Sequence, residues 1–302
     1  MLRGWLAAGI LLTTLLAGAW GVARFYPFEL VVASRRVGLW RGGARRVRAA
    51  TLMAYERDRC EGGAPCRCIG LIHGLGDSAM TWDKLLLDPK VAAPGTRLMA
   101  VELPGSEGSQ APADYRVPTM ARAVRAALES RCPSWTIAGN SLGGWVTLQL
   151  ALDWPQGVDA LVLVDAAGID EPTGVTEANA RALADPTVDK LKAFRRLARH
   201  NDREIPERVW PSAVAAIEGR PTKKIVEALG RDQLLDARLP SLRVPVTILW
   251  GESDRIIPVD VGVRMHRGIR GSRLVRIPGC GHLPQQECPE TVAAAILARR
   301  KS

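Results

Sequence analysis

A tight turn with the sequence Gly139-Asn140-Ser141-Leu142-Gly143 constrains this chain more than any other feature. It follows an apolar run at 135–138 and precedes a helix-like run that begins at Leu142, so Ser141 falls on a sharp turn between a strand and a helix. The two flanking glycines remove Cβ atoms where the backbone turns and where strand and helix pack closely. Such a turn exposes the serine hydroxyl, and the N–H of Leu142 at the helix N-terminus points toward any oxyanion formed nearby. The pattern also fits a glycine-rich packing turn, so the interpretation of Ser141 as a nucleophile needs partner residues elsewhere.

Apolar runs and helical stretches alternate along the rest of the chain. Continuous apolar runs predict strands at 47–55, 66–72, 98–102, 135–138, 160–164, 246–250 and 274–277. Helices are expected at 82–87, 119–130, 142–152, 258–268 and 289–300. Strands of this kind are typical of a mostly parallel central sheet with helices on both faces, so we expect an α/β fold.

The long helical and polar segment 171–240 interrupts the alternation. Leu191, Phe194 and Leu197 fall on one face of an amphipathic stretch that follows Asp185-Pro186. We expect a helical lid here, inserted after the strand 160–164. Because open α/β sheets bind ligands at the carboxyl ends of their strands, the lid would lie above the site. The expected organisation is therefore a core at 47–170 and 241–302 with a lid at 171–240.

The first 46 residues have a different composition. Residues 5–23 carry no charge and approach the roughly 20 apolar residues that span a bilayer. Residues 1–23 fit a signal peptide, with Met1-Leu2-Arg3 as a basic start and Ala17-Gly18-Ala19 as a cleavage signal, and they equally fit an uncleaved membrane anchor. The sequence therefore predicts a membrane-associated protein or one exported after cleavage, although the arginines that follow would favour keeping the catalytic part in the cytoplasm.

A basic connector is expected at 24–46. The chain has a net charge of +10, and arginines concentrate between Arg24 and Arg48, where Glu29 is the only acid. This composition suits anionic lipid headgroups at a membrane surface, and a solvated connector is the alternative. No aromatic-interleaved basic motif indicates a nucleic-acid partner, and no protein partner is indicated.

The cysteines indicate the redox compartment in which the protein folds. There are six: Cys60, Cys66, Cys68, Cys132, Cys280 and Cys288. Three of them crowd a short segment, which is easier to explain by a disulfide than by core packing, and this favours an oxidising compartment. Six cysteines allow 15 pairings, so the connectivity stays open. A Cys-x-Cys metal site is a weaker alternative because no further ligand pair accompanies it.

Two segments supply the partners expected for Ser141. Gly251-Glu252-Ser253-Asp254 follows a strand, and we select Asp254 as the acid, with Glu252 and Asp165 as alternatives. Gly279-Cys280-Gly281-His282 follows the last strand, and a loop flanked by glycines can bring the His282 imidazole toward the serine. The order Ser141, Asp254, His282 is the one used by Ser-His-Asp triads on α/β-hydrolase folds.

The turn His73-Gly74-Leu75-Gly76 supplies the remaining part of the site. The Leu75 N–H can join the Leu142 N–H in binding the negative oxygen of a tetrahedral intermediate. His73 is then expected to be a packing and hydrogen-bonding residue rather than a base.

With these residues assembled, the chain resembles the α/β-hydrolase superfamily from about Val47 onward. It is similar to the membrane-anchored esterase and monoacylglycerol lipase group, and also to the carbon–carbon hydrolases of meta-cleavage products. The stretches that carry the resemblance are His73-Gly74-Leu75-Gly76, Glu102-Leu103-Pro104-Gly105, residues 139–144, residues 250–258, and Pro278-Gly279-Cys280-Gly281-His282. One departure is Glu107, where relatives usually have a glycine, and it affects the expected shape of the site entrance. Related dehalogenases and epoxide hydrolases use an aspartate as nucleophile, so Ser141 counts against both activities.

The resemblance implies a serine hydrolase that cleaves carboxylic esters of small molecules or lipids without a metal or organic cofactor. A carbon–carbon hydrolase is the alternative, and it would need a basic lid residue such as Arg195 or Arg196 facing the serine to hold a carboxylate. A non-catalytic binding protein on the same fold is disfavoured because every catalytic position is filled. The sequence leaves open the acyl chain length, the cleavage of residues 1–19, the membrane orientation and the oligomeric state.

Overall fold

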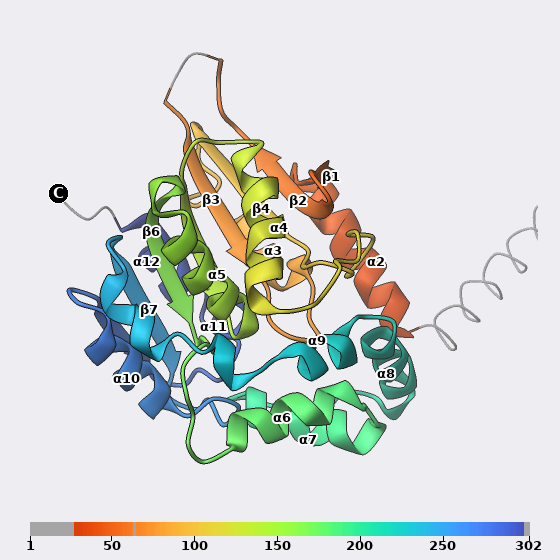
Figure 1. Ribbon diagram of the computed structural model, residues 1–302. Helices are drawn as coiled ribbons and strands as arrows, with labels where there is room; N and C mark the ends of the chain where they lie inside the picture. The colour runs from red at the N-terminus through yellow and green to blue at the C-terminus, as the bar shows by residue number, and fades with distance from the viewer. Residues whose placement is uncertain (1–26, 63–64, 299–302) are drawn as a thin grey trace, which may run out of the picture.

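A computed structural model describes residues 27–62 and 65–298 and contains an eight-stranded sheet with helices on both faces (Figure 1). The strands lie in the order β1-β2-β4-β3-β5-β6-β7-β8. Their bounds are β1 (Arg45–Ala49), β2 (Leu52–Asp58), β3 (Arg67–Ile72), β4 (Thr96–Val101), β5 (Trp135–Asn140), β6 (Val158–Val164), β7 (Val246–Gly251) and β8 (Arg273–Ile277). β2 pairs antiparallel with both β1 and β4, and every pairing from β4 to β8 is parallel, so the expected mostly parallel sheet is confirmed.

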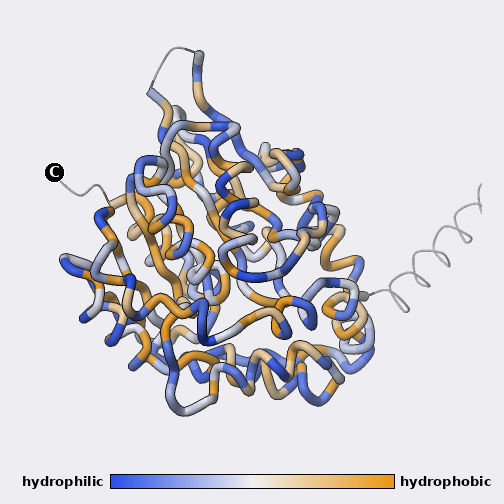
Figure 2. Tube along the Cα trace, in the orientation of Figure 1, coloured by the Kyte–Doolittle hydropathy of each residue, from blue (hydrophilic) through white to orange (hydrophobic). Residues whose placement is uncertain are grey.

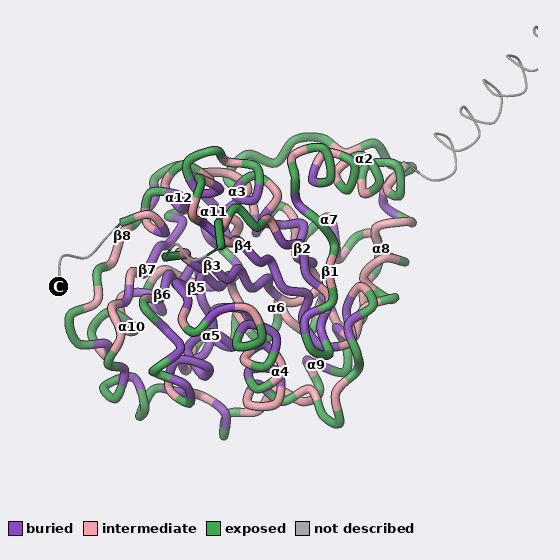
Figure 3. The backbone as a smooth tube through the Cα atoms, turned by 90° about the horizontal axis from the view of Figure 1, so that it is seen from above, coloured by how far each residue is buried: buried purple, intermediate pink, exposed green. Residues whose placement is uncertain are grey.

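Helices cover both faces of this sheet, and a separate apolar cluster lies on each face. On one face α4 (Val117–Glu129), α5 (Leu142–Asp153) and α10 (Val259–Gly268) cover the larger apolar cluster. On the other face α3 (Asp83–Leu87) and α12 (Pro289–Leu297) cover a second cluster, and the short α11 (Pro284–Glu287) precedes α12. Successive residues of β3 enter opposite clusters, as the period-two alternation of a strand requires: Cys68 faces the first and Ile69 the second. Figure 2 shows apolar segments running through the sheet, and Figure 3 shows the strands as the most buried part of the chain.

The single strand predicted at 47–55 was wrong, because the structure has a hairpin there. Ala49 pairs with Leu52, so Ala50 and Thr51 form a two-residue turn between β1 and β2. Ala50 has a φ of 48°. Glycine or asparagine usually signals such a turn, and neither is present. The sequence therefore gives no signal for this turn, and only the pairing of β1 with β2 reveals it.

The segment 24–46, expected as a basic connector, contains a helix, α2 (Pro27–Arg41). β1 starts at Arg45, before the expected end of the connector. The side chain of Leu39 is buried in the second cluster, whereas Trp40 is 61% exposed. Arg35 donates to Asp83 at 2.7 Å and to the carbonyl of Met80 at 2.6 Å, which attaches α2 to the segment around α3. No apolar stripe at helical spacing marks this stretch, so sequence periodicity did not reveal the helix.

The apolar segment 5–23 lies outside the described residues. Within residues 27–62 and 65–298, none of the helices combines the length and the apolar character that crossing a bilayer requires.

The expected helical insertion after the sixth strand is present and contains α6 (Val175–Ala184), α7 (Val188–Ala198), α8 (Trp210–Glu218) and α9 (Thr222–Ala228). These helices lie across the carboxyl edge of the parallel strands (Figure 1). The amphipathic stretch after Asp185-Pro186 is α7, which begins with Thr187 accepting a hydrogen bond from the Lys190 N–H. Leu191 is buried, and Phe194 and Leu197 are partly buried against the core. We refer to residues 171–240 as the insertion.

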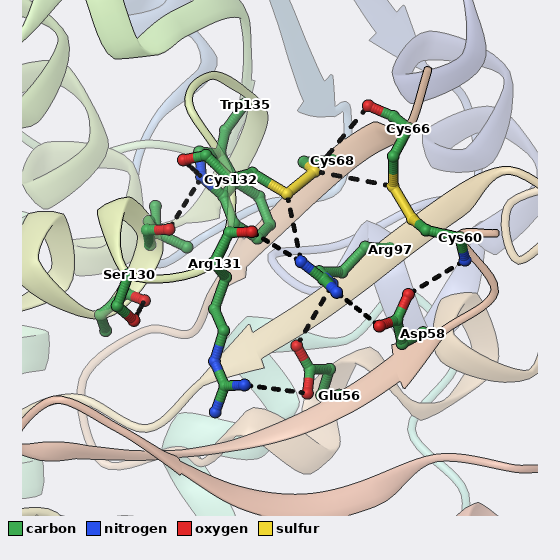
Figure 4. Close-up of polar contacts among 12 residues, drawn as sticks. Glu56, Asp58, Cys60, Cys66, Cys68, Arg97, Ser130, Arg131, Cys132 and Trp135 are labelled. Carbon is green, nitrogen blue, oxygen red and sulfur yellow. Dashed lines mark hydrogen bonds and ion pairs between the residues drawn. A yellow bond between two sulfur atoms is a disulfide. The ribbon is translucent and has the colours of Figure 1, made fainter. Parts of the chain in front are cut away.

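Three disulfides pair all six cysteines: Cys60–Cys66, Cys68–Cys132 and Cys280–Cys288. The first two lie beside Arg97, whose guanidinium donates to the Arg131 carbonyl and forms an ion pair with Asp58 (Figure 4). Because Cys66 and Cys68 are both oxidised, they do not form the Cys-x-Cys metal site considered from the sequence. Three disulfides are typical of proteins that fold in an oxidising compartment.

Candidate active site

Ser141 lies between β5 and α5 in a backbone conformation that few residues adopt, with a φ of 56° and a ψ of −121°. Its N–H donates to the carbonyl of Val164 at 3.1 Å, and its carbonyl accepts from the N–H of Ala167 at 3.0 Å. The turn is therefore fixed to the end of β6. A Cβ on Gly143 would lie 2.3 Å from the Ile72 carbonyl oxygen, so only glycine fits two residues after the serine. Strain held by surrounding structure at an exposed nucleophile is typical of hydrolase active sites.

Asp254 and His282 form a buried hydrogen-bonded pair. The Nδ1 of His282 lies 2.7 Å from the Oδ2 of Asp254, and the two residues are 4% and 8% exposed. The other oxygen, Oδ1, accepts the N–H groups of Ile256 and Ile257 at 2.7 and 3.1 Å. The carboxylate therefore holds the proton of the imidazole on Nδ1, which leaves Nε2 free to accept one.

The loop that carries His282 is attached on both sides. Its N–H donates to the carbonyl of Ala198 at 2.8 Å, and its carbonyl accepts from the side-chain amide of Asn140 at 3.0 Å. The disulfide Cys280–Cys288 closes the loop around the histidine. Backbone contacts from the insertion and from the nucleophile turn thus set the position of the imidazole.

A cavity of about 960 Å³ lies between the sheet edge and the insertion, and Ser141, His282, Leu75 and Leu142 all line it. Asp254 does not line the cavity and lies behind the imidazole. The apolar part of the wall comes mostly from the insertion and includes Leu183, Leu191, Phe194, Trp210 and Ile217. The structure therefore brings four of the five predicted site residues to one cavity and the fifth into hydrogen-bond contact with one of them. A pocket of this size and lining suits a small or medium-sized apolar ligand.

His73 makes structural contacts, as expected. The N–H of Leu103 donates to its Nε2 at 3.0 Å, so the ring proton is on Nδ1, which donates to the Gly74 carbonyl at 2.8 Å. The buried ring therefore joins the Leu75 turn to the end of β4.

The two alternative acids occupy different environments. Glu252 is exposed and forms an ion pair with Arg276 at 3.1 Å, away from the imidazole. Asp165 is fully buried beside Asp254, and its Oδ1 accepts the Gly251 N–H at 2.9 Å. Burial, followed by the charge of Asp254, raises the pKa of the Asp165 carboxyl well above its usual range. A protonated Asp165 can donate a hydrogen bond to Asp254, which would hold that carboxylate in place.

Asp165, Asp254 and His282 also bring three potential metal-ligand atoms within 4.8 Å of one another. The Asp254 carboxylate is already engaged by the chain, because its Oδ1 accepts the N–H groups of Ile256 and Ile257 and its Oδ2 contacts the imidazole of His282. A carboxylate paired with the imidazole Nδ1 is the arrangement that orients a base.

The two arginines considered from the sequence also differ. Arg195 lines the cavity, but its guanidinium forms an ion pair with Asp202 at 2.9 Å and donates to the carbonyl of Arg203. Arg196 is exposed and does not line the cavity.

Glu107, noted as a departure from the family pattern, has a φ of 47°, a conformation that favours glycine. Its carboxylate accepts from Arg36 of α2 at 2.8 Å and from Arg220 of the insertion at 3.4 Å. Arg220 also donates to the carbonyl of Gly76 at 2.6 Å, beside Leu75. Sequence reasoning missed Arg220, because no local signal shows that an insertion residue contacts the Leu75 turn.

Comparisons with known proteins identify the family of this chain. The model of the Alpha/beta hydrolase family matches residues 71–295. An uncharacterized protein of Mycobacterium tuberculosis is 32% identical over 266 residues, which cover 79% of this chain and 76% of that protein. A 2-hydroxy-6-oxononadienedioate/2-hydroxy-6-oxononatrienedioate hydrolase of Klebsiella pneumoniae is 27% identical over 245 residues, which cover 75% of this chain and 84% of that protein.

Among solved structures, a membrane phospholipase A described as a bacterial virulence factor superposes with a TM-score of 0.76 at 26% identity, covering 98% of both chains. Since the family model matches well over half of the sequence, and the sheet order and crossover helices agree with it, this chain belongs to the alpha/beta hydrolase family and is a hydrolase.

Proposed function

We propose that this protein is a serine hydrolase that cleaves carboxylic esters by a Ser141–His282–Asp254 triad. The observation that carries the proposal is the 2.7 Å contact between Asp254 and His282, whose imidazole shares one cavity with Ser141 on its strained turn. A partly exposed serine beside an oriented imidazole is the combination that nucleophilic acyl transfer requires.

In the proposed reaction the Nε2 of His282 takes the Ser141 proton as the hydroxyl oxygen attacks the ester carbonyl. The N–H groups of Leu75 and Leu142 stabilise the oxyanion, and the imidazolium then protonates the leaving alcohol. A water molecule deprotonated by the same imidazole cleaves the acyl-enzyme and releases the acid. Residues of this chain supply every proton transfer.

Lipid esters are the proposed substrates, and a membrane surface is the proposed partner. Two observations support this: the apolar cavity wall contributed by the insertion, and the likeness to a membrane phospholipase A over nearly the whole chain. The exposed apolar side chains of α2, Leu30, Val31, Val37 and Trp40, directly follow the apolar segment 5–23. We propose that the N-terminal region is a membrane anchor or a cleaved export signal.

A carbon–carbon hydrolase is the second candidate, because the relative from Klebsiella pneumoniae acts on 2-hydroxy-6-oxononadienedioate. A series of p-nitrophenyl esters, assayed beside a vinylogous diketone from a meta-cleavage pathway, separates the two activities. Higher kcat/KM on the esters supports the first proposal, and higher kcat/KM on the diketone supports the second.

Fluorophosphonate labelling tests the serine chemistry that both candidates share. The wild-type protein should label, and Ser141→Ala should neither label nor turn over esters, a loss on the order of 10⁶ in kcat. A wild-type protein that stays unlabelled, or a Ser141→Ala variant that still labels, would contradict the triad.

A further inference from the structure

Among the residues that the structure describes, six cationic side chains line the cavity, and they differ in whether they already form an ion pair. Four form ion pairs, namely Arg35 with Asp83, Arg181 with Glu177, Arg195 with Asp202 and Arg231 with Asp170. Lys223 is exposed to solvent. Arg199 is the sixth, and its side chain is partly buried; within the described part of the chain its guanidinium has neither a hydrogen bond nor an ion pair.

The backbone around Arg199 is held on both sides. The carbonyl of the preceding residue, Ala198, accepts the N–H of His282, and the N–H of the following residue, His200, donates to Glu287 at 3.1 Å. The His200 ring also lies 2.7 Å from the hydroxyl of Ser253, next to Asp254. Arg199 therefore projects into the cavity from a segment whose position is fixed relative to the proposed base.

Within the described residues, no carboxylate forms a direct ion pair with this guanidinium, although Glu287 and Asp77 lie near it. Glu287 uses its two oxygens to accept the N–H groups of His200 and Gly281, and Asp77 accepts the N–H of Ser78. Burial lowers the pKa of Arg199, while the charges of Glu287 and Asp77 raise it. An arginine stays charged in any case, so the cavity holds a partly desolvated cation without a direct partner.

We propose that Arg199 is a specificity-determining residue that binds an anionic group of the substrate, so that the ester carries a carboxylate or phosphate besides the scissile carbonyl. This rests on the proposed ester hydrolysis at Ser141. The planar fork of a guanidinium matches both anions with two parallel hydrogen bonds, and an incoming anion would offset the desolvation of Arg199. Most of the remaining wall is apolar and suits the hydrocarbon part of the same molecule.

Two matched substrate pairs distinguish where the anion lies. p-Nitrophenyl hexanoate and mono-p-nitrophenyl adipate differ by a carboxylate on the acyl side, and monooleoylglycerol and lysophosphatidic acid with the same acyl chain differ by a phosphate on the alcohol side. For the pair with the correct placement, Arg199→Met should lower the ratio of kcat/KM for the anionic to the neutral ester by about 10–100-fold. Arg199→Lys keeps the charge but not the fork, and should recover part of this ratio.

Arg196→Met is the matched control, because Arg196 comes from the same end of α7 but is exposed and outside the cavity. It removes the same charge and should leave both ratios at the wild-type value. Thermal melts confirm that each variant is folded. Ratios that stay within about twofold of wild type in both pairs for Arg199→Met, or an equal fall for anionic and neutral esters, would overturn the proposal.

A binding measurement separates this proposal from the proposed reaction. Hexyl phosphate should raise the melting temperature of the wild-type and Arg196→Met proteins more than hexanol does, and this difference should be lost in Arg199→Met. If no ester is cleaved but the Arg199-dependent shift remains, the ester hydrolase proposal fails and the anion site stands. If the esters are cleaved and neither the rates nor the melts depend on Arg199, the anion site fails alone.

Discussion

The carbonyl of Ala198, the last residue of α7, accepts a hydrogen bond from the backbone N–H of His282 at 2.8 Å. Glu287 adds a second connection, because its carboxylate accepts the N–H groups of both His200 and Gly281. The insertion therefore does more than cover the cavity, since its helix end supports the loop of the proposed base. Changes on either side of this junction should affect the reaction.

Asp254→Asn should lower kcat for ester hydrolysis by roughly 10⁴-fold with little loss of stability. An amide next to Nδ1 can favour the wrong imidazole tautomer, and it no longer stabilises the imidazolium. Steady-state kinetics measure the effect. Glu252→Gln is the control, because it removes a carboxylate two residues away that pairs with Arg276 on the surface. A comparable loss in the control would argue against Asp254 as the triad acid.

Asp165→Asn should stabilise the protein, and more so as the pH rises. The pKa of Asp165 is raised in the folded state, so between the ordinary carboxyl value and this raised value the folded protein binds more protons than the unfolded chain. The wild-type free energy of unfolding then falls with pH through this window. Asparagine can still accept from Gly251 and donate to Asp254, and it tolerates the φ of 46° at this position.

Thermal melts from about pH 4 to about pH 9 measure this effect. The difference in melting temperature between Asp165→Asn and wild type should grow with pH and then level off above the raised pKa. A difference that is the same at every pH would mean that Asp165 does not hold a proton in the folded protein.

Arg220→Met should lower kcat about tenfold, with a smaller change in KM. Arg220 supports the turn that carries the Leu75 N–H through its bond to the Gly76 carbonyl, and losing an oxyanion donor outright costs about 10²–10³ in kcat. Arg220→Met keeps the Leu75 N–H but holds it less firmly, so the loss in kcat should be smaller than that. Arg238→Met is the control, since Arg238 pairs with Asp153 outside the cavity. If Arg220→Met changes only KM, Arg220 acts on substrate binding and not on the oxyanion.

Replacing both Cys280 and Cys288 by serine should lower the free energy of unfolding by about 2–3 kcal/mol and also lower kcat. The disulfide closes a short loop that contains His282. Its loss should raise the conformational entropy of the unfolded chain, and it should also let the His282 imidazole move in the folded protein. Removing Cys60–Cys66, which closes a loop of similar length away from the cavity, should cost similar stability and leave kcat unchanged. Denaturant titration and ester kinetics on both double variants provide the comparison. Equal kcat in the two would show that the disulfide does not position His282.

The local chemistry of the site was readable from the sequence. Only glycine fits beside Ser141, and the strand ends place Asp254 and His282 in loops at one edge of a parallel sheet. The positions of Ser141, Leu142 and Leu75 follow from strand-to-turn transitions, which leave a strong pattern of apolar runs ended by glycine. The helical insertion was readable for the same reason, since a long polar and helical stretch interrupts the alternation of strands and helices.

Features that depend on contacts between residues far apart in the chain were decided only by the tertiary structure. The helix α2 and the β1–β2 hairpin lack a periodic or turn signal, and their packing against α3 and β4 forms them. The disulfide pairing was one of 15 possibilities. The roles of Asp165, Arg220 and Arg199 come from burial and from partners contributed by other elements. Sequence determines which groups are present, but a charge becomes paired, shared or left without a partner only when the fold sets its neighbours and excludes water.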